Sequence, residues 1–251
     1  MAATAAVYGN YKGYQGSART TTGSNTSSNI LDERLGLVST AVPSIFSHSR
    51  VLDIGCNDGR VAVDIALHFG PAAVTGLDPD GALIVKAKSH LSFRWSRLGP
   101  NGEVDYYPAS AVQKTGHVPY PLDEGGEGLP HCVRFAKADF VDWEGAGEGS
   151  CSTVLMLSVV KWIHLEHGDE GLTRAFAKVA ALLEVGGHFV FEPQDAKSYE
   201  TAVKKNPRLK EKKAALKIEP EDFTRMLEEV GLELVHEIGG RKRSIGIWRK
   251  K

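Results

Sequence analysis

The sequence predicts an α/β fold built on a seven-stranded sheet that is mostly parallel and ends in an antiparallel closing hairpin. From residue 50 onward, short apolar runs typical of buried strands alternate with segments whose apolar residues recur at helical spacing. The chain closes with two strand-like runs joined by Gly239-Gly-Arg-Lys-Arg243. Five strands from the alternating part and two from the hairpin account for the seven.

The elements of this fold are expected in a regular order. Apolar runs predict strands at 50–55, 73–78, 132–138, 153–157 and 188–191, followed by hairpin strands at 232–238 and 244–248. Helical spacing covers 58–69, 80–93 and 169–183, with a stop expected at Gly186-Gly187. A final helix begins near Pro220, which suits a first helical turn, and ends before Gly231.

The chain divides into an N-terminal segment, 1–30, and one larger domain, 31–251. The first segment joins an aromatic-glycine stretch, Tyr8-Gly-Asn-Tyr-Lys-Gly-Tyr14, to a Ser/Thr/Asn-rich linker, and it has too little apolar surface to order itself. Within the larger domain, a Gly/Pro-rich insertion at about 96–130 is longer than an ordinary connection, which indicates a functional or mobile segment. A basic segment, 197–217, precedes the last helix.

Bulk composition narrows the class of protein. The 251 residues suffice for one α/β domain with insertions, and the net charge of −1 leaves any nucleic-acid partner to a local basic patch. The cysteines, Cys56, Cys132 and Cys151, show no Cys-x-x-Cys spacing, which favours reduced thiols. No signal peptide and no apolar run near 18 residues is present, so a soluble intracellular protein is expected.

The most informative motif is Val51-Leu-Asp-Ile-Gly-Cys-Asn-Asp-Gly59. A buried strand, a tight glycine turn and a helix follow one another here, so backbone amides can approach a ligand closely. Asp78 ends the next strand, where a carboxylate can hold ribose hydroxyls. Position 57 is Asn, which argues against a dinucleotide fingerprint. The pattern instead resembles the S-adenosylmethionine site of a class I methyltransferase, a Rossmann-like fold.

Further candidate ligand residues lie at the expected carboxyl ends of the strands, where open α/β sheets bind ligands. Asp53 is as well explained by a turn-stabilising carboxylate as by ligand contact, whereas Asp78 favours contact because a buried carboxylate must find donors. Asp139 can accept from an adenine amino group. The full predicted cofactor set of the domain is Asp53, Gly55, Asn57, Gly59, Asp78, Pro79, Asp139 and Leu157.

The fourth strand runs into Lys161 and Trp162, a cation beside a stacking aromatic. This combination suits an anionic or nucleotide substrate. The alternative, a lysine extending to solvent and a core tryptophan, has equal weight from the residues alone. His164 and His167 have a spacing that could bind metal, but structural or surface histidines are favoured, so no metal is expected.

Several motifs along the chain carry a common resemblance to one known family. The central one is Leu157-Ser-Val-Val-Lys-Trp-Ile-His-Leu-Glu-His-Gly-Asp-Glu-Gly171. The others, in chain order, are Tyr8-Gly-Asn-Tyr11 with Tyr14 and Arg19, Asp32-Glu-Arg-Leu35, Gly55-Cys-Asn57, Tyr107-Pro-Ala-Ser110, Glu192-Pro-Gln194 with Ser198-Tyr199, and Lys217-Ile-Glu-Pro-Glu-Asp-Phe223. Together these motifs resemble the bicoid-interacting-protein family of RNA methyltransferases, and the Pro-Ala-Ser match favours its branch of methylphosphate capping enzymes.

The resemblance implies an S-adenosylmethionine-dependent enzyme that methylates the 5′ terminal (γ) phosphate of a small noncoding RNA. It implies catalytic roles for Lys161, Tyr11 and Arg19. It adds Tyr8 to the cofactor set, and it implies substrate contacts for Tyr14, Trp162, Gln194 and Tyr199. The aromatic N-terminus would then fold over cofactor and RNA end, its ordering coupled to binding.

Two clusters of basic residues elsewhere in the chain are candidates for contacts with the RNA. The segment 197–217 carries eight Lys or Arg against two Glu, and Arg241-Lys-Arg243 adds a second cluster. A solvated helix face is the common alternative, but an RNA substrate favours phosphate contacts for part of this surface.

Other functions stay open from the sequence. They are a class I methyltransferase for a protein or small molecule, an RNA-binding ribonucleoprotein subunit with secondary or lost activity, and a nicotinamide oxidoreductase. For the favoured function we expect a 5′-phosphorylated small noncoding RNA and La-related ribonucleoprotein components as partners. We also expect no membrane association, a monomer, and a nuclear location with the cytoplasm as the alternative.

Overall fold

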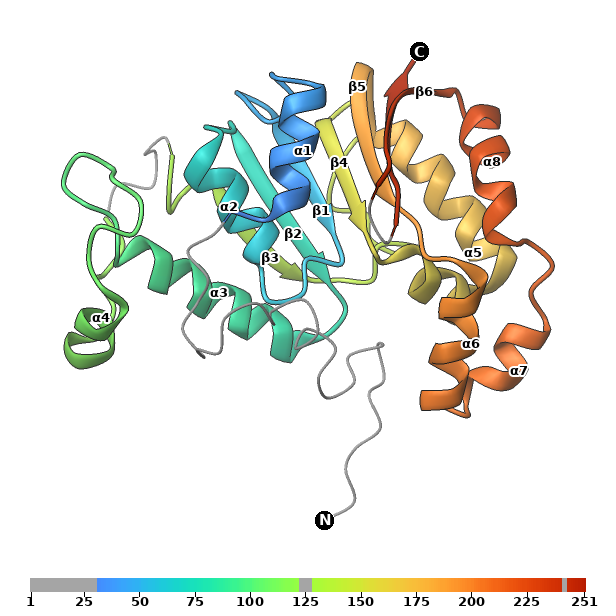
Figure 1. Ribbon diagram of the computed structural model, residues 1–251, viewed down its shortest axis with the longest axis horizontal. Coiled ribbons are helices and arrows are strands. Elements are labelled where there is room, and N and C mark those ends of the chain that lie inside the picture. Colours follow the sequence, from blue (N-terminus) through green and yellow to red (C-terminus); the bar gives the residue numbers. More distant parts are fainter. Residues whose placement is uncertain (1–30, 122–127, 241–242) are drawn as a thin grey trace.

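The computed structural model describes residues 31–121, 128–240 and 243–251, and its centre is a seven-stranded sheet (Figure 1). The strand order is β3-β2-β1-β4-β5-β7-β6. The strands are β1 (Arg50–Ile54), β2 (Ala73–Asp78), β3 (Val133–Lys137), β4 (Cys151–Leu157), β5 (Leu183–Glu192), β6 (Leu232–Ile238) and β7 (Ile245–Lys250). The first five are parallel, and β7 pairs antiparallel with both β5 and β6.

Helices cover both faces of this sheet (Figure 1). They are α1 (Glu33–Ala41), α2 (Arg60–His68), α3 (Gly81–Trp95), α4 (Ala109–Thr115), α5 (Val160–Leu182), α6 (Ala196–Lys205), α7 (Leu209–Ala214) and α8 (Phe223–Glu229), with a 3-10 turn, η2 (Pro220–Asp222), before α8. No helix in the described ranges is both long and apolar enough to cross a membrane.

The two core layers follow from alternation along the strands, since successive side chains of a strand point to opposite faces. On β4, Val154 and Met156 pack with α5 and α8, whereas Leu155 packs with α1, α2 and α3 on the other face. Both layers are buried, which explains why the central strands read as continuous apolar runs.

The structure departs from the expected boundaries around α5 and β5. The helix was expected to start at residue 169, but it begins at Val160 and continues through a kink at Gly168, whose φ is +68°. The kink explains the misplaced start, because a glycine followed by acidic residues resembles a new helix beginning. Gly186 and Gly187 were expected to end the helix, yet they lie inside β5, and Gly186 has a φ of +80°.

Four helices form where no helix was predicted: α1, α4, α6 and α7. Two of them begin at side-chain caps, since Asp32 accepts from the Arg34 amide and Asp195 accepts from the Ser198 amide. The insertion lies at one end of the molecule and carries α4, while α6 and α7 lie together at the other end (Figure 1). The predicted N-terminal segment, 1–30, lies outside the described residues, so the domain division stays a prediction.

Candidate active site at the carboxyl edge of the sheet

The loop between β1 and α2 adopts a backbone shape that depends on its glycines. Gly55, Asn57 and Gly59 all have left-handed φ values, of +70°, +54° and +76°. A Cβ on Gly55 would collide with the Val159 side chain, and one on Gly59 would lie 2.6 Å from Phe135 Cζ. Side chains are therefore excluded at both positions, and the loop keeps its backbone close to the edge of the sheet.

Asp78 joins this loop to the end of β2. Its Oδ2 accepts from the Asn57 amide at 3.0 Å, and its Oδ1 accepts from the Asp80 amide at 2.9 Å. Burial raises the pKa of the Asp78 carboxyl, and the two backbone donors oppose that shift. Asp78 thus fixes the predicted ligand loop, and its contact with ribose hydroxyls stays a prediction.

Asp53, at the carboxyl end of β1, is the least satisfied polar group of the site. Its side chain is 3% exposed, and its Oδ2 has no hydrogen-bond partner among the described residues. Burial raises the pKa of Asp53 to about 7, with the Arg34 charge opposing the shift. A buried carboxyl without a partner calls for a ligand that can donate to it.

These features fit S-adenosylmethionine. The molecule carries an ammonium group and a sulfonium, which suit an unpartnered buried carboxyl, and ribose hydroxyls, which suit a carboxylate at the end of β2. The glycine loop supplies the space that a close backbone approach needs. Residues Asp53, Gly55, Asn57, Gly59 and Asp78 are therefore brought together as predicted, although their contacts with the cofactor stay a prediction.

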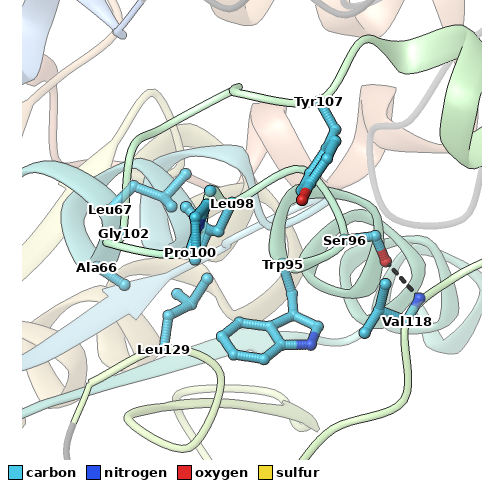
Figure 2. Close-up of a pocket in the computed structure, with 11 residues that line it drawn as sticks. Ala66, Leu67, Trp95, Ser96, Leu98, Pro100, Gly102, Tyr107, Val118 and Leu129 are labelled. Atoms are coloured by element: carbon cyan, nitrogen blue, oxygen red, sulfur yellow. Dashed lines mark hydrogen bonds between the residues drawn. The ribbon is translucent and has the colours of Figure 1, made fainter.

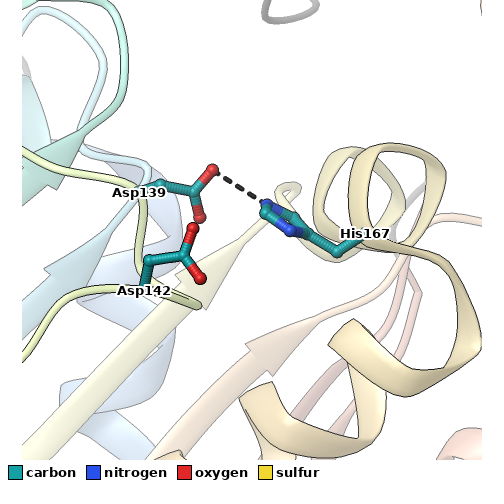
Figure 3. Close-up of side chains that lie close together, drawn as sticks. All are labelled: Asp139, Asp142 and His167. Carbon is teal, nitrogen blue, oxygen red and sulfur yellow. Dashed lines mark hydrogen bonds and ion pairs between the residues drawn. The ribbon is translucent and has the colours of Figure 1, made fainter.

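Asp139 lies after β3 and faces His167 from α5 (Figure 3). His167 Nε2 lies 2.9 Å from Asp139 Oδ2, while Asp139 Oδ1 accepts from the Val141 amide at 3.1 Å. With Asp142, these residues offer three ligand atoms within 4.8 Å of one another, a grouping that could hold a divalent cation. His167 and Asp139 already provide each other with a hydrogen-bond partner. No metal was expected here, and that expectation stays a prediction.

A hydrogen-bond network that the sequence did not predict covers the carboxyl ends of β4 and β5. Ser158, with a φ of +61°, donates its hydroxyl to Glu192 and accepts from Arg243 Nη1 at 2.8 Å. The Gln194 side-chain amide donates to the Ser158 carbonyl oxygen, and Arg34 Nη1 donates to Glu192 Oε2 at 3.2 Å. Hydrogen bonds thus connect α1, the residue that follows β4, the end of β5 and the β6–β7 turn.

Lys161 lies next to this network, at the start of α5. Its Nζ donates to Ser198 Oγ at 2.8 Å and lies 4.4 Å from the centre of the Trp162 ring. Its amide donates to Gln194 Oε1 at 3.1 Å. Burial lowers the pKa of Lys161 to about 8, and the neighbouring Arg243 charge adds to that effect. The ammonium also donates to the Ser198 carbonyl oxygen at 3.3 Å, and because it has no ion pair in the described part of the chain, its charge and its third N–H are available to an anion.

Tyr199, a predicted substrate contact, is part of a small buried cluster. The side chain is 3% exposed, and its hydroxyl is hydrogen-bonded to His164 Nδ1 at 3.1 Å. His164 Nε2 in turn pairs with Asp169 Oδ1 at 2.8 Å. Burial raises the pKa of the Tyr199 phenol. Half-buried Trp162 packs against the same cluster, so Tyr199 supports the substrate side of α5 and α6, and direct contact stays a prediction.

The remaining predicted residues divide into two groups. Leu157 and Pro79 lie at the carboxyl ends of β4 and β2, within the site edge. The N-terminal set lies outside the described residues and stays a prediction; it consists of Tyr8, Tyr11, Tyr14 and Arg19. The sequence assigned no individual role to Arg34, Ser158, Glu192 or Arg243, which the structure brings together. All four lie in stretches that the sequence singled out: Arg34, Ser158 and Glu192 are in family motifs, and Arg243 is in the basic cluster Arg241-Lys-Arg243.

A separate hollow of about 650 Å³ lies at the insertion, where Trp95, Tyr107 and Val118 line it (Figure 2). The Val118 amide donates to Ser96 Oγ at 2.8 Å and holds the insertion against the end of α3. Helices α2 and α3 begin at the glycine-loop edge, so their last turns, which contribute Leu67 and Trp95, lie at the opposite edge of the sheet. This hollow is therefore not part of the candidate active site.

Comparisons with known proteins identify relatives of this chain. A family model described as Bicoid-interacting protein 3 (Bin3) matches residues 151–250. The U6 snRNA methylphosphate capping enzyme Amus of Drosophila melanogaster is 30% identical over 97% of this chain and 74% of its own length. The human 7SK snRNA methylphosphate capping enzyme is 32% identical over 74% of this chain, which spans 31% of that protein.

A more distant relative and a solved structure complete the comparison. The RNA 5'-monophosphate methyltransferase of Rattus norvegicus is 26% identical over 63% of this chain and 50% of its own length. The N-methyltransferase NodS of Bradyrhizobium japonicum, solved with S-adenosyl-L-homocysteine, superposes with a TM-score of 0.54 at 14% identity, over 90% of this chain and 89% of that one. This likeness shows the fold and confirms the predicted fold class.

Proposed function

The chain belongs to the Bicoid-interacting protein 3 family of RNA methyltransferases, and we propose that it methylates the 5′-terminal phosphate of a small noncoding RNA. It is an S-adenosylmethionine-dependent methyltransferase, in agreement with the family, the fold and the glycine loop. The observation that carries the phosphate proposal is Lys161, whose buried ammonium has no carboxylate ion pair within the described residues and lies beside the predicted cofactor edge.

The chain's own residues mainly position the reactants. When bound, S-adenosylmethionine supplies a methyl group on a cationic sulfur, and the phosphate oxygen–carbon bond forms as the carbon–sulfur bond breaks, with the electron pair left on sulfur. The terminal phosphate oxygen is already anionic, so no strong base is required. The positive Lys161 side chain attracts and orients that phosphate, and the rigid edge held by Asp78 and Gln194 keeps the geometry fixed.

Lys161 is matched to this task by its surroundings. With a pKa of about 8, it is mostly protonated at pH 7, and although the nearby Asp195 charge favours the protonated form, no carboxylate forms an ion pair with it within the described residues. Its ammonium also lies over the face of Trp162, which fixes the direction of the charge. A few donors aimed in this way orient the nucleophile without withdrawing much of its charge.

The γ-phosphate of a triphosphate end is the proposed acceptor. The support is the higher identity and coverage of the methylphosphate capping relatives compared with the monophosphate methyltransferase. The decisive experiment measures transfer of labelled methyl from the cofactor to matched RNAs that bear a 5′ triphosphate, monophosphate or hydroxyl. We expect the triphosphate RNA to be labelled best; equal labelling of the hydroxyl RNA would contradict the proposal.

We further propose that the protein acts as a nuclear monomer alongside La-related ribonucleoprotein components. The support is indirect: two relatives are named for small nuclear RNAs, U6 and 7SK. Light scattering of the purified chain tests the monomer, and imaging of the tagged protein tests the location. Co-purification from nuclear extract before and after ribonuclease treatment tests the protein partners.

A further inference from the structure

Arg243 reaches the active centre from the β6–β7 turn. Although 85 residues separate it from Ser158, its Nη1 donates to Ser158 Oγ at 2.8 Å, at the carboxyl end of β4. The side chain is half-buried, and it forms no ion pair with a carboxylate anywhere in residues 31–121, 128–240 and 243–251. A half-buried guanidinium that is held only by a hydroxyl retains most of its donors for another ligand.

The same edge holds a second cation, Lys161, which forms no ion pair with any residue that the structure describes. The Gln194 side chain links the two, because it donates to the Ser158 carbonyl oxygen and accepts from the Lys161 amide at 3.1 Å. The positive charge of Arg243 is close enough to lower the pKa of Lys161. Asp195 opposes this effect, and Lys205 adds to it.

The two nearby carboxylates are engaged by other groups: Asp195 Oδ1 accepts from the Ser198 amide at 2.8 Å at the start of α6, and Glu192 lies within the network. Glu192 is engaged by Ser158 and by Arg34, whose Nη1 lies 3.2 Å from Glu192 Oε2. Lys161 and Arg243 therefore repel each other across a partly desolvated edge, an arrangement that an anion between them would stabilise. An anion that carries several charged groups would be bound more strongly than one with a single group, because it can contact both cations.

We propose that Arg243 and Lys161 together form a subsite for adjacent phosphates of the RNA 5′ end, so that Arg243 selects polyphosphorylated ends over monophosphorylated ends. The inference rests on the proposed function and adds the residue that sets its specificity. One cation suffices for a single phosphate. A second one, with the planar fork that binds phosphate oxygens in pairs, contributes only when a second phosphate follows.

A purely positioning role for Arg243 makes a different prediction. In that case Arg243 serves only to hold Ser158 in its left-handed conformation, and its charge is irrelevant. Arg243→Gln separates the two roles, since the amide of glutamine can still donate to Ser158 Oγ but carries no charge. Arg50→Ala is the matched control, because it removes the same charge from a different place. Arg50 is exposed and begins β1, at the opposite edge of the sheet.

The first test uses inorganic anions and does not depend on methyl transfer. Binding of tripolyphosphate and of orthophosphate to the full chain is measured by calorimetry at one fixed ionic strength. We expect Arg243→Gln to weaken tripolyphosphate binding by roughly tenfold, as for the loss of one charge-assisted contact, with a much smaller effect on orthophosphate. Arg50→Ala should change neither. Equal weakening of both anions, or wild-type binding by Arg243→Gln, would overturn the proposal.

The second test compares kcat/KM for matched triphosphate and monophosphate RNAs. Arg243→Gln should reduce the preference for triphosphate by about tenfold, and Arg243→Lys should restore part of it, because the charge returns without the fork. An unchanged preference would overturn the specificity role. Failure of the proposed function would be recognised separately, as equal labelling of a 5′-hydroxyl RNA by the wild-type chain while selective tripolyphosphate binding persists.

Discussion

Arg34 Nη1 donates to Glu192 Oε2 at 3.2 Å, which fastens α1 to the carboxyl end of β5. The same guanidinium contacts both carboxylate oxygens of Asp32, at 2.9 and 2.7 Å. Its charge also opposes the burial effect that raises the pKa of Asp53. One side chain in the first described helix therefore controls the electrostatics of two carboxylates at the site edge.

Arg34→Ala should destabilise the folded protein by about 3 kcal/mol, because the Glu192 carboxylate would remain buried without its cation. The measurement is the free energy of unfolding from denaturant titration. Arg225→Ala provides the control, since Arg225 forms its ion pairs on the exposed surface of α8 and its loss should change little. Equal effects of the two substitutions would show that the Arg34 pair is not structurally important.

The central sheet could be predicted because its signals are local. Buried strands such as β4 read as apolar runs, and the turn between β1 and α2 requires the glycines at 55 and 59. The predicted sheet was therefore correct in class and in its closing hairpin. In contrast, α6 buries only Tyr199 and Ala202 beneath a lysine-rich surface, so its apolar periodicity was too sparse to predict.

The missed part of the site depends on contacts between distant residues. Arg34 and Glu192 are separated by 158 positions, and Ser158 and Arg243 by 85. No periodicity or motif spacing records such a pairing, because it arises only when the strand order places β4, β5 and the β6–β7 turn side by side. Sequence reasoning located the edge of the sheet but not the network that crosses it.

Asp78→Ala should weaken S-adenosylmethionine binding by about 1–3 kcal/mol. The substitution removes a predicted ligand contact and also the acceptor that holds the Asn57 amide at 3.0 Å. Calorimetric titration with the cofactor measures the change. Glu184→Gln, which removes an exposed carboxylate at the start of β5, should leave the affinity unchanged. Unaltered affinity in Asp78→Ala would place the cofactor elsewhere.

Asp53 should make cofactor binding depend on pH. Its pKa is raised from 3.8 to about 7 by burial, and a cationic ligand favours the ionised form. Affinity should therefore rise by about tenfold from pH 6 to pH 8, as the ionised fraction increases. Calorimetry at several pH values measures this change, and Asp53→Asn should abolish it.

The free protein should show the opposite trend in stability. A carboxyl whose pKa is raised in the folded state stabilises that state fully below about pH 4, and this contribution is lost as the pH rises through 7. Asp53→Asn should remove that part of the pH dependence of unfolding. An identical pH profile in the variant would show that the Asp53 pKa is not raised in the folded protein.

Chelation should leave methyl transfer unchanged, because His167 and Asp139 satisfy each other at 2.9 Å without a metal. His167→Ala should lower cofactor affinity by less than about 1 kcal/mol, since Asp139 would lose an orienting partner in a partly exposed place. Activity assays after treatment with a chelator and calorimetry on the variant provide the measurements. A metal that raises the melting temperature of wild type but not of His167→Ala would contradict this prediction and establish a metal site.

Lys161→Ala should lower turnover on 5′-phosphorylated RNA while cofactor affinity stays near the wild-type value, because the Lys161 ammonium bonds Ser198, whereas the glycine loop is held by Asp78. Steady-state kinetics and cofactor calorimetry on the same preparation separate these effects. Loss of cofactor binding would instead make Lys161 a structural residue.

The pH dependence of this enzyme tests the charge of Lys161 directly. Burial and Arg243 lower the Lys161 pKa to about 8, so kcat/KM, which reports the free enzyme, should fall as the pH rises from 7 to 9 and the ammonium loses its proton. Lys161→Arg should abolish that alkaline decline, since a guanidinium stays protonated, although its shape will reduce the rate. Arg243→Gln should move the decline to higher pH, because the removal of a neighbouring positive charge raises the pKa of Lys161. An alkaline limb that is unchanged in both variants would show that another group titrates, and Lys161 would lose its assigned role as the charged phosphate-binding residue.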